Sequence, residues 1–290
     1  MSNLTITLIQ SKLHWEDKAA NLQQFEDKIA GIGQKTTLVI LPEMFSTGFS
    51  MKPELLAESM QGPTVQWMKK MASENKIILT GSVIIEDNGQ FYNRLIWMLP
   101  NGQYGHYDKR HRFAYAGEDQ HYAAGSKRLI ASVNGWKVNL QVCYDLRFPI
   151  WARQQHGNAL NDTGEHQTLS ELPPHNTEHT PEYDLLIYVA NWPERRNHAW
   201  KTLLQARAIE NQSYVIGLNR VGNDGNDIYH SGDSMVIDPL GEALYQKAHD
   251  EDVHTHTLSK EKLEEVRKKF PFWKDADEFH ILNPHEEKVQ

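Results

Sequence analysis

The chain has one cysteine in 290 residues, Cys143. A single cysteine excludes a disulfide within the chain and is typical of a protein from a reducing compartment. An excess of basic residues is also missing, because 30 Lys and Arg stand against 38 Asp and Glu, a formal net charge of −8 at pH 7. Nucleic-acid-binding and membrane-surface proteins usually carry clustered positive charge, so we expect neither kind of partner.

Long hydrophobic runs are absent as well. No apolar stretch approaches the ~18 residues that a membrane-spanning helix requires. The N-terminal sequence has neither the basic start nor the apolar stretch of a signal peptide. We therefore expect a soluble, cytoplasmic protein.

Strand-like and helix-like runs follow one another along the whole chain, with no repeat, linker or clear boundary. Counting them gives about a dozen strands and four or five helices, which favours a single domain over residues 1–290 in which helices flank two packed sheets. Ile77–Thr80 and Val83–Glu86 are predicted as separate strands. A helix is predicted from about His198 to Asn211, with Leu203, Leu204, Ala206 and Ile209 facing the core.

An irregular insertion at about residues 154–182 interrupts this pattern. It is rich in Asn, Thr, His, Glu and Pro and shows no periodicity. A structureless segment of this length is uncommon inside a compact domain. Its histidines suggest a metal site, but their spacing matches no site that we can name, and a solvated insertion is the alternative. These histidines are His156, His166, His175 and His179.

Cys143 directly follows a predicted strand that begins at Trp136, and Phe148-Pro149 opens a helix after it. The end of a strand, before a turn into a helix, is where open α/β sheets carry their chemistry. The backbone N–H of Tyr144 would face the same space and could stabilise an oxyanion. The alternative is a buried apolar residue, because unpaired cysteines are among the most buried residues.

Two further residues with catalytic side chains directly follow strands. Glu43 comes after a short apolar strand that ends at Leu41, and Lys109 comes after the strand Tyr104–Asp108. If these strands and that of Cys143 are neighbours running in the same direction, the three side chains meet at one rim. A carboxylate, an ammonium group and a thiol in one pocket are the groups that a hydrolase with a cysteine nucleophile requires.

The charges of the three groups assign their roles. A thiol with a pKa of ~8.5 is mostly protonated at neutral pH and needs a base or a cation beside it. Glu43 is predicted to accept the proton, to pass it to a departing amine and then to activate water. Lys109 and the Tyr144 N–H are predicted to stabilise the tetrahedral oxyanion.

Each assignment has a structural alternative. Glu43 is otherwise an exposed loop acid, and Lys109 lies in Asp-Lys-Arg-His-Arg, which by itself indicates a solvated basic loop. Glu118 is either a second carboxylate that orients Lys109 or a loop acid. Three histidines are more typical of surface or hydrogen-bonded core positions than of catalysis: His111, His121 and His198.

Three motifs resemble the signature blocks of the nitrilase superfamily of C–N hydrolases: Leu41-Pro42-Glu43-Met44-Phe45, Tyr107-Asp108-Lys109-Arg110-His111 and Val142-Cys143-Tyr144-Asp145-Leu146-Arg147-Phe148-Pro149. The resemblance continues through residues 188–193, 206–211, 232–234 and 272–279. It covers nearly the whole chain apart from the insertion, and it is strongest to the bacterial omega-amidase branch.

This resemblance implies a four-layer αββα sandwich, in which two mixed β-sheets carry helices on their outer faces. It also implies a Glu-Lys-Cys triad with Glu43 as base, Lys109 as oxyanion lysine and Cys143 as nucleophile. The family's additional active-site glutamate falls on Glu118. The branch hydrolyses the terminal amide of 2-oxoglutaramate and 2-oxosuccinamate, so we expect a small amide carrying a carboxylate as substrate. No metal or cofactor is expected, and at least a homodimer is implied.

A substrate carboxylate requires a cation at a fixed distance from the thiol. Arg147, Arg195 and Arg196 are candidates because a guanidinium group matches a carboxylate, although a structural ion pair is the alternative for Arg147. Aromatic residues near the strand ends are predicted to line the pocket, with plain packing as the alternative. These residues are Phe113, Tyr115, Tyr144 and Trp192.

Three other functions remain open at this point. The first is a Cys-His hydrolase, which needs a particular histidine as base. The second is another amidase, a carbamoylase or a nitrilase with the same triad, which only the reaction products distinguish. The third is an inactive scaffold or binding member, whose thiol would not be reactive.

Overall fold

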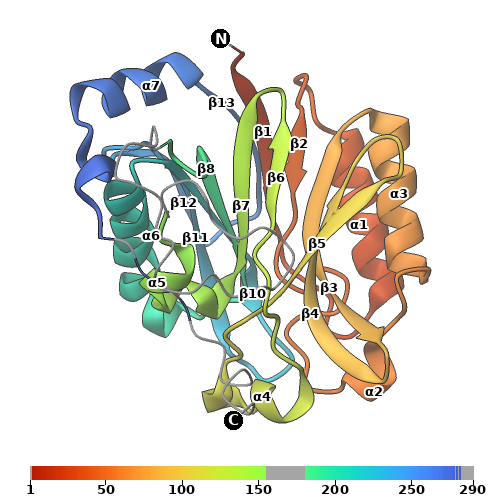
Figure 1. Ribbon diagram of the computed structural model, residues 1–290. Helices are drawn as coiled ribbons and strands as arrows, with labels where there is room; N and C mark the ends of the chain where they lie inside the picture. The colour runs from red at the N-terminus through yellow and green to blue at the C-terminus, as the bar shows by residue number, and fades with distance from the viewer. Residues whose placement is uncertain (1, 155–179, 278, 280, 282–290) are drawn as a thin grey trace.

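The computed structural model describes residues 2–154, 180–277, 279 and 281. Two β-sheets pack face to face, and helices cover their outer sides (Figure 1). The predicted αββα sandwich of two mixed sheets is therefore confirmed. The core between the sheets is apolar and draws buried residues from both of them, such as Leu8 and Leu95 from one sheet and Leu140 and Ile187 from the other.

The first sheet has six strands, and its central strands β1, β2 and β3 run parallel. Helices α1 (Lys18–Ala30) and α3 (Pro63–Asn75) cover its outer face (Figure 1). The Asp17 side chain caps α1 by accepting a hydrogen bond from the Ala20 N–H. In order across the sheet the strands are β13 (Asp252–Leu258), β1 (Leu4–Gln10), β2 (Leu38–Ile40), β3 (Ile78–Asp87), β4 (Gln90–Met98) and β5 (Tyr104–Asp108).

The second sheet has seven strands, of which β7, β8 and β9 run parallel. Helix α6 (Asn197–Asn211) packs on its outer face, and α7 (Lys260–Lys269) follows β13 (Figure 1). The short helices are α2 (Pro53–Leu56), α4 (Glu118–His121) and α5 (Pro149–Ala152). The strands are β10 (Val221–Asn223), β11 (Tyr229–Ile237), β9 (Tyr214–Asn219), β8 (Leu185–Ala190), β7 (Trp136–Val142) and β6 (Ile130–Val133), with β12 (Ala243–Ala248) paired to β11.

Two details differ from the sequence prediction. The two strands predicted between Ile77 and Glu86 form the single strand β3, in which Gly81 lets another segment approach closely: a Cβ there would lie 2.8 Å from the Cβ of Leu41. Helix α6 also buries a different face from the one predicted, because Ile209 is 56% exposed whereas Arg207 is buried. Arg207 faces inward because its guanidinium donates a 2.6 Å hydrogen bond to the carbonyl of Leu146.

The histidines proposed as metal ligands in the insertion lie outside the described residues. Within the described part of the chain, no group of three or more His, Cys, Asp or Glu is arranged to hold a metal ion. No helix in the same part is both long and apolar enough to cross a membrane.

Acid is expected to destabilise the protein partly through His230 on β11. Burial and the nearby charge of Arg220 lower the pKa of His230 from 6.5 to about 4. Between these values the unfolded chain binds the proton and the folded protein does not, so the free energy of unfolding should fall as the pH drops from about 6.5 to about 4. The shift corresponds to roughly 3 kcal/mol. Denaturant titrations of His230→Gln should show a shallower pH slope, whereas a slope equal to that of the exposed control His198→Gln would contradict this account.

Candidate active site

The three predicted catalytic residues follow strands of both sheets. Glu43 follows β2 and Lys109 follows β5, two strands that run in the same direction in the first sheet but are separated by β3 and β4. Cys143 follows β7 in the second sheet. The three strands were expected to be neighbours in one sheet, and this expectation is wrong. The structure nevertheless brings the three side chains together where the two sheets meet.

Glu43 is fully buried, and each of its carboxylate oxygens has a fixed donor. Oε1 accepts hydrogen bonds from Lys109 Nζ at 2.9 Å and from Asn93 Nδ2 at 2.8 Å. Oε2 accepts one from the backbone N–H of Asn191 at 2.7 Å, and the Asn191 side chain donates to the Glu43 carbonyl at 2.6 Å. Donors from both sheets therefore hold this carboxylate in one orientation.

Lys109 lies between two carboxylates and is 1% exposed. Its ammonium group donates to Glu118 Oε1 and Oε2 at 2.9 and 2.8 Å, and to Glu43 at 2.9 Å. Burial alone would lower the pKa of Lys109, but Glu118 and Glu43 raise it above its ordinary value, so the lysine remains charged. Burial, partly opposed by Lys109, raises the pKa of Glu118. The solvated-loop alternative for Lys109 is thus inconsistent with the structure.

Cys143 begins a tight turn over residues 143–147 and is 8% exposed. Its backbone φ is +45°, a left-handed value that is uncommon for a residue with a side chain. Such a turn presents the thiol at the end of the strand, and backbone strain of this kind clusters at functional sites. The carboxylate of Glu43 acts electrostatically on this thiol. Burial and Glu43 raise the pKa of Cys143 well above its ordinary value, although Lys109 opposes them, so the resting thiol is neutral.

Asp145 fixes this turn against the loop that follows β5. Its Oδ2 accepts hydrogen bonds from the Val142 N–H at 3.0 Å and from the Tyr107 hydroxyl at 2.8 Å. Its Oδ1 accepts one from the His111 N–H at 2.9 Å and contacts His111 Nδ1 at 2.8 Å. His111 thus joins the two loops, in keeping with the hydrogen-bonded alternative predicted for it.

A family profile described as carbon-nitrogen hydrolase matches residues 5–268. The chain belongs to the carbon-nitrogen hydrolase family. It is 43% identical to Omega-amidase YafV of Escherichia coli (strain K12), over 97% of this chain and 100% of the relative. It is 28% identical to the 2-oxoglutaramate amidase of Bacillus subtilis (strain 168), over 93% of this chain and 96% of the relative.

A solved structure supports the same assignment. XC1258 from Xanthomonas campestris, described as a CN-hydrolase superfamily protein with an arsenic adduct in the active site, matches with a TM-score of 0.87 and 40% sequence identity. The match covers 97% of this chain and 100% of that one. The nitrilase-superfamily resemblance drawn from the three motifs is therefore confirmed.

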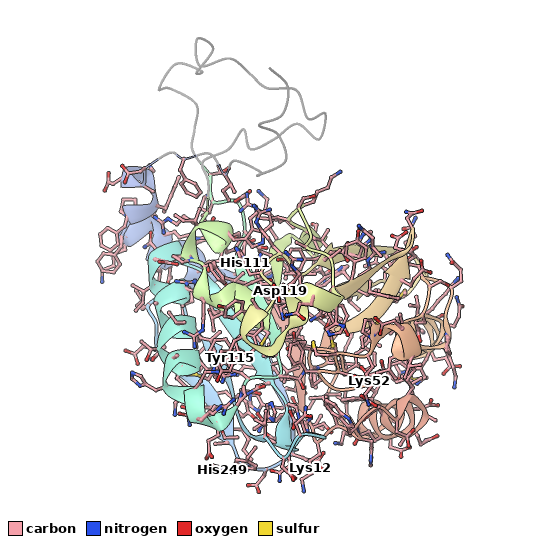
Figure 2. All side chains as sticks on the ribbon, turned by 90° about the horizontal axis from the view of Figure 1, so that it is seen from below. Lys12, Lys52, His111, Tyr115, Asp119 and His249 are labelled. Atoms are coloured by element: carbon pink, nitrogen blue, oxygen red, sulfur yellow. The ribbon has the colours of Figure 1, made fainter. Side chains whose placement is uncertain are left out.

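The four predicted pocket aromatics of this carbon-nitrogen hydrolase differ in their burial and contacts. The rings of Phe113 and Tyr144 lie 5.0 Å apart, and the Phe113 N–H donates to Glu118 at 2.5 Å. Trp192 is buried, whereas Tyr115 is 82% exposed and lies on the face shown in Figure 2. Phe113, Tyr144 and Trp192 thus lie close to the candidate catalytic residues, and Tyr115, whose ring lies 5.7 Å from that of Phe113, is further out.

The three candidate arginines occupy different positions. Arg147 is exposed, with its guanidinium 5.0 Å from the ring centre of Trp192. Arg195 is exposed, and Arg196 is half-buried over the ring of Phe113 at 5.1 Å. No described acid pairs with any of the three, in contrast to Arg94, which binds Asp108.

Sequence reasoning missed three residues of the carbon-nitrogen hydrolase site. Asn93 on β4 bonds Glu43 and approaches Glu118 at 3.4 Å, and Asn191 after β8 bonds Glu43 twice. The ring of Phe49 lies 5.1 Å from Lys109 Nζ. The available signal for Asn93 was a polar residue inside a strand, next to Arg94, while nothing in the local sequence marks Phe49.

Proposed function

We propose that this chain is an omega-amidase, which hydrolyses the terminal amide of 2-oxoglutaramate or 2-oxosuccinamate to the 2-oxo dicarboxylate and ammonia through a Cys143 thioester. One observation carries the proposal: a buried carboxylate that contacts a buried, charged lysine acts electrostatically on a neutral thiol and raises its pKa. The curated relatives named omega-amidase and 2-oxoglutaramate amidase support this substrate class. The unpaired arginines nearby support a substrate with a carboxylate.

In the proposed acylation step, Glu43 accepts the thiol proton as the sulfur attacks the amide carbon. Glu43 suits this role because Lys109 and Asn93 anchor one of its carboxylate oxygens, and because its charge acts on the thiol. The proton then passes to the amide nitrogen, so that ammonia leaves and the thioester remains. Neither step requires a resting thiolate, which agrees with the raised pKa of Cys143.

Deacylation uses the same carboxylate. Glu43 takes a proton from water, the hydroxide adds to the thioester carbon, and the proton returns to the sulfur as the acid product leaves. In both steps negative charge collects on the former amide oxygen. The charge of Lys109 and the backbone N–H of Tyr144 stabilise that oxygen, while Glu118 keeps Lys109 in place.

An ammonia-release panel tests this proposal. The substrates are 2-oxoglutaramate, 2-oxosuccinamate, glutamine, asparagine and a simple nitrile. We expect the two 2-oxo amides to give the highest kcat/KM, with one equivalent of ammonia for each equivalent of 2-oxo acid. A preference for the nitrile, or carbon dioxide as an additional product from a carbamoyl substrate, would favour a nitrilase or a carbamoylase instead.

Alkylation of Cys143 separates an enzyme from an inactive scaffold. We expect iodoacetamide to modify native protein with a stoichiometry of one and to abolish ammonia release in parallel, because Cys143 is the sole thiol. A dicarboxylate product such as 2-oxoglutarate should slow the modification. Intact-protein mass spectrometry follows both effects, and a native thiol that resists alkylation would indicate a merely structural cysteine.

We also propose a single domain acting in the cytoplasm as at least a homodimer, as the family resemblance implies. The hydrophobic core shared by both sheets supports one domain. The exposed side chains of Ile209 and Leu240, at 56% and 48%, support association. Light scattering gives the mass in solution, and one cooperative unfolding transition is expected.

A further inference from the structure

Asn93 is a polar residue at the end of an apolar row on strand β4. Successive side chains of a strand point to opposite faces, so Asn93 shares its face with Leu95 and Trp97, which belong to the core between the sheets. Asn93 is 1% exposed. A leucine here would continue the apolar row, whereas a buried amide is unfavourable unless it forms hydrogen bonds. The contacts that Asn93 makes at the candidate active site must therefore offset this cost.

Three contacts join Asn93 to the acidic and basic groups of the site. Its Nδ2 donates to Glu43 Oε1 at 2.8 Å and, at the longer distance of 3.4 Å, to Glu118 Oε1. Its backbone carbonyl accepts a 3.0 Å hydrogen bond from the N–H of Lys109. Because both neighbours of the amide are carboxylate oxygens, its nitrogen and not its oxygen faces them. Asn93 is thus a donor to both acids.

The charges of these groups are unequal, because one ammonium group faces two carboxylates. Lys109 donates to Glu43 at 2.9 Å and to the two oxygens of Glu118 at 2.9 and 2.8 Å. Burial and the charge of Glu43 raise the pKa of Glu118, although Lys109 opposes them. The excess negative charge needs further donors, since hydrogen bonds to a carboxylate favour its charged form. Asn93 supplies such donors without adding a charge.

We propose that Asn93 is a positioning residue that keeps Glu43 charged and oriented beside Cys143, and so allows Glu43 to accept the thiol proton. The inference rests on the proposed mechanism, in which Glu43 is the base. Lys109 and Asn93 hold Oε1 of Glu43, and the N–H of Asn191 holds Oε2 at 2.7 Å. The carboxylate cannot rotate without breaking these bonds. Because Asn93 acts through Glu43, its loss should lower kcat more than it changes KM.

The test measures ammonia release from 2-oxoglutaramate as a function of pH. Asn93→Leu removes the N–H donors and adds no charge. We expect kcat at neutral pH to fall about 10- to 100-fold, the usual value of a hydrogen bond to a charged group, and KM to change by less than about 2-fold. Asn93→Ala carries the same expectation and introduces no additional bulk, so it replaces Asn93→Leu if the leucine variant does not fold.

The pH profile distinguishes this role from a merely structural one. Without the Asn93 donors the Glu43 carboxylate takes up a proton more readily, so the acidic limb of the kcat profile should move up by about 1 to 2 pH units. The limb belongs to the whole cluster, because the groups on which Glu43 acts titrate together with it. These groups are Lys109, Glu118, Tyr122 and Cys143.

Two further variants serve as controls. Asn93→Asp keeps the shape of the side chain but places an acceptor against Glu43 and Glu118, so it should lose at least as much activity as Asn93→Leu. Asn139→Leu is the matched control, because Asn139 is likewise a buried amide, on β7, and bonds Gln141. It should leave the acidic limb unchanged. The inference is overturned if Asn93→Leu keeps the wild-type limb, or if Asn93→Asp is fully active.

A second readout does not depend on turnover. Transfer of the thiol proton to Glu43 also precedes alkylation of Cys143, so the acidic limb of the iodoacetamide reaction should move up equally in Asn93→Leu. If wild-type protein hydrolyses no 2-oxo amide yet the variant shows this shift, the omega-amidase proposal fails and the role of Asn93 stands. If wild-type protein hydrolyses 2-oxoglutaramate and neither limb moves in the variant, the assignment to Asn93 fails alone.

Discussion

Glu43→Gln is expected to lower kcat for 2-oxoglutaramate by about 10³-fold, within the range of general acid–base catalysis. The Cys143 thiol is neutral at rest because burial and Glu43 raise its pKa, so it cannot attack without losing its proton to a base. An amide at position 43 keeps the shape of the side chain but cannot accept that proton. Both acylation and deacylation should therefore fail.

Single-turnover mass spectrometry checks this prediction, because the variant should accumulate no thioester with 2-oxoglutaramate. Its melting temperature should stay close to that of the wild type, since Lys109 keeps its two bonds to Glu118. Glu54→Gln, an exposed substitution on α2, is the matched control and should keep full activity. A fully active Glu43→Gln would end the proposed mechanism and favour a histidine base.

Lys109→Met is expected to affect both rate and stability. Loss of the oxyanion partner should lower kcat by about 10²- to 10³-fold. Removal of the ammonium group also leaves Glu43 and Glu118 buried without their cation, at a cost of about 3–5 kcal/mol in the free energy of unfolding. Denaturant unfolding and ammonia release measure the two effects separately.

The double variant Lys109→Met/Glu118→Gln separates structural from catalytic loss. Neutralising Glu118 removes one of the two unpaired carboxylates, so a substantial part of the stability should return. Activity should not return, because the oxyanion still lacks its cation. If activity recovers together with stability, Lys109 acts only as a structural counter-ion.

The sequence allowed the meeting of Glu43, Lys109 and Cys143 to be predicted because each residue comes soon after a strand. It did not reveal that Cys143 comes from a different sheet than Glu43 and Lys109, because strand pairing depends on contacts far apart in the chain. Asn191 shows the same limit, since its importance lies in two hydrogen bonds to Glu43, 148 residues away. Ile209 was predicted to face inward because apolar periodicity gives no account of the bond from Arg207 to Leu146.

Strand β13 was not predicted for a related reason. Its sequence, Asp-Val-His-Thr-His-Thr-Leu, has few apolar residues and no apolar alternation. The strand forms because β1 provides an antiparallel partner, with hydroxyl pairs at 3.0 Å between Thr5 and Thr257 and at 2.9 Å between Thr7 and Thr255. Such cross-strand pairs stabilise a sheet but cannot be recognised from one strand alone.

The pairing of β1 with β13 has a consequence for biosynthesis. Thr7 and Thr255 are 248 positions apart, so one side of β1 stays open on the ribosome until β13 has been made. An unpaired strand edge invites association with other nascent chains. Glu43 is likewise translated long before Cys143 and Asn191, so premature termination before β13 yields fragments with the acid but without a completed sandwich.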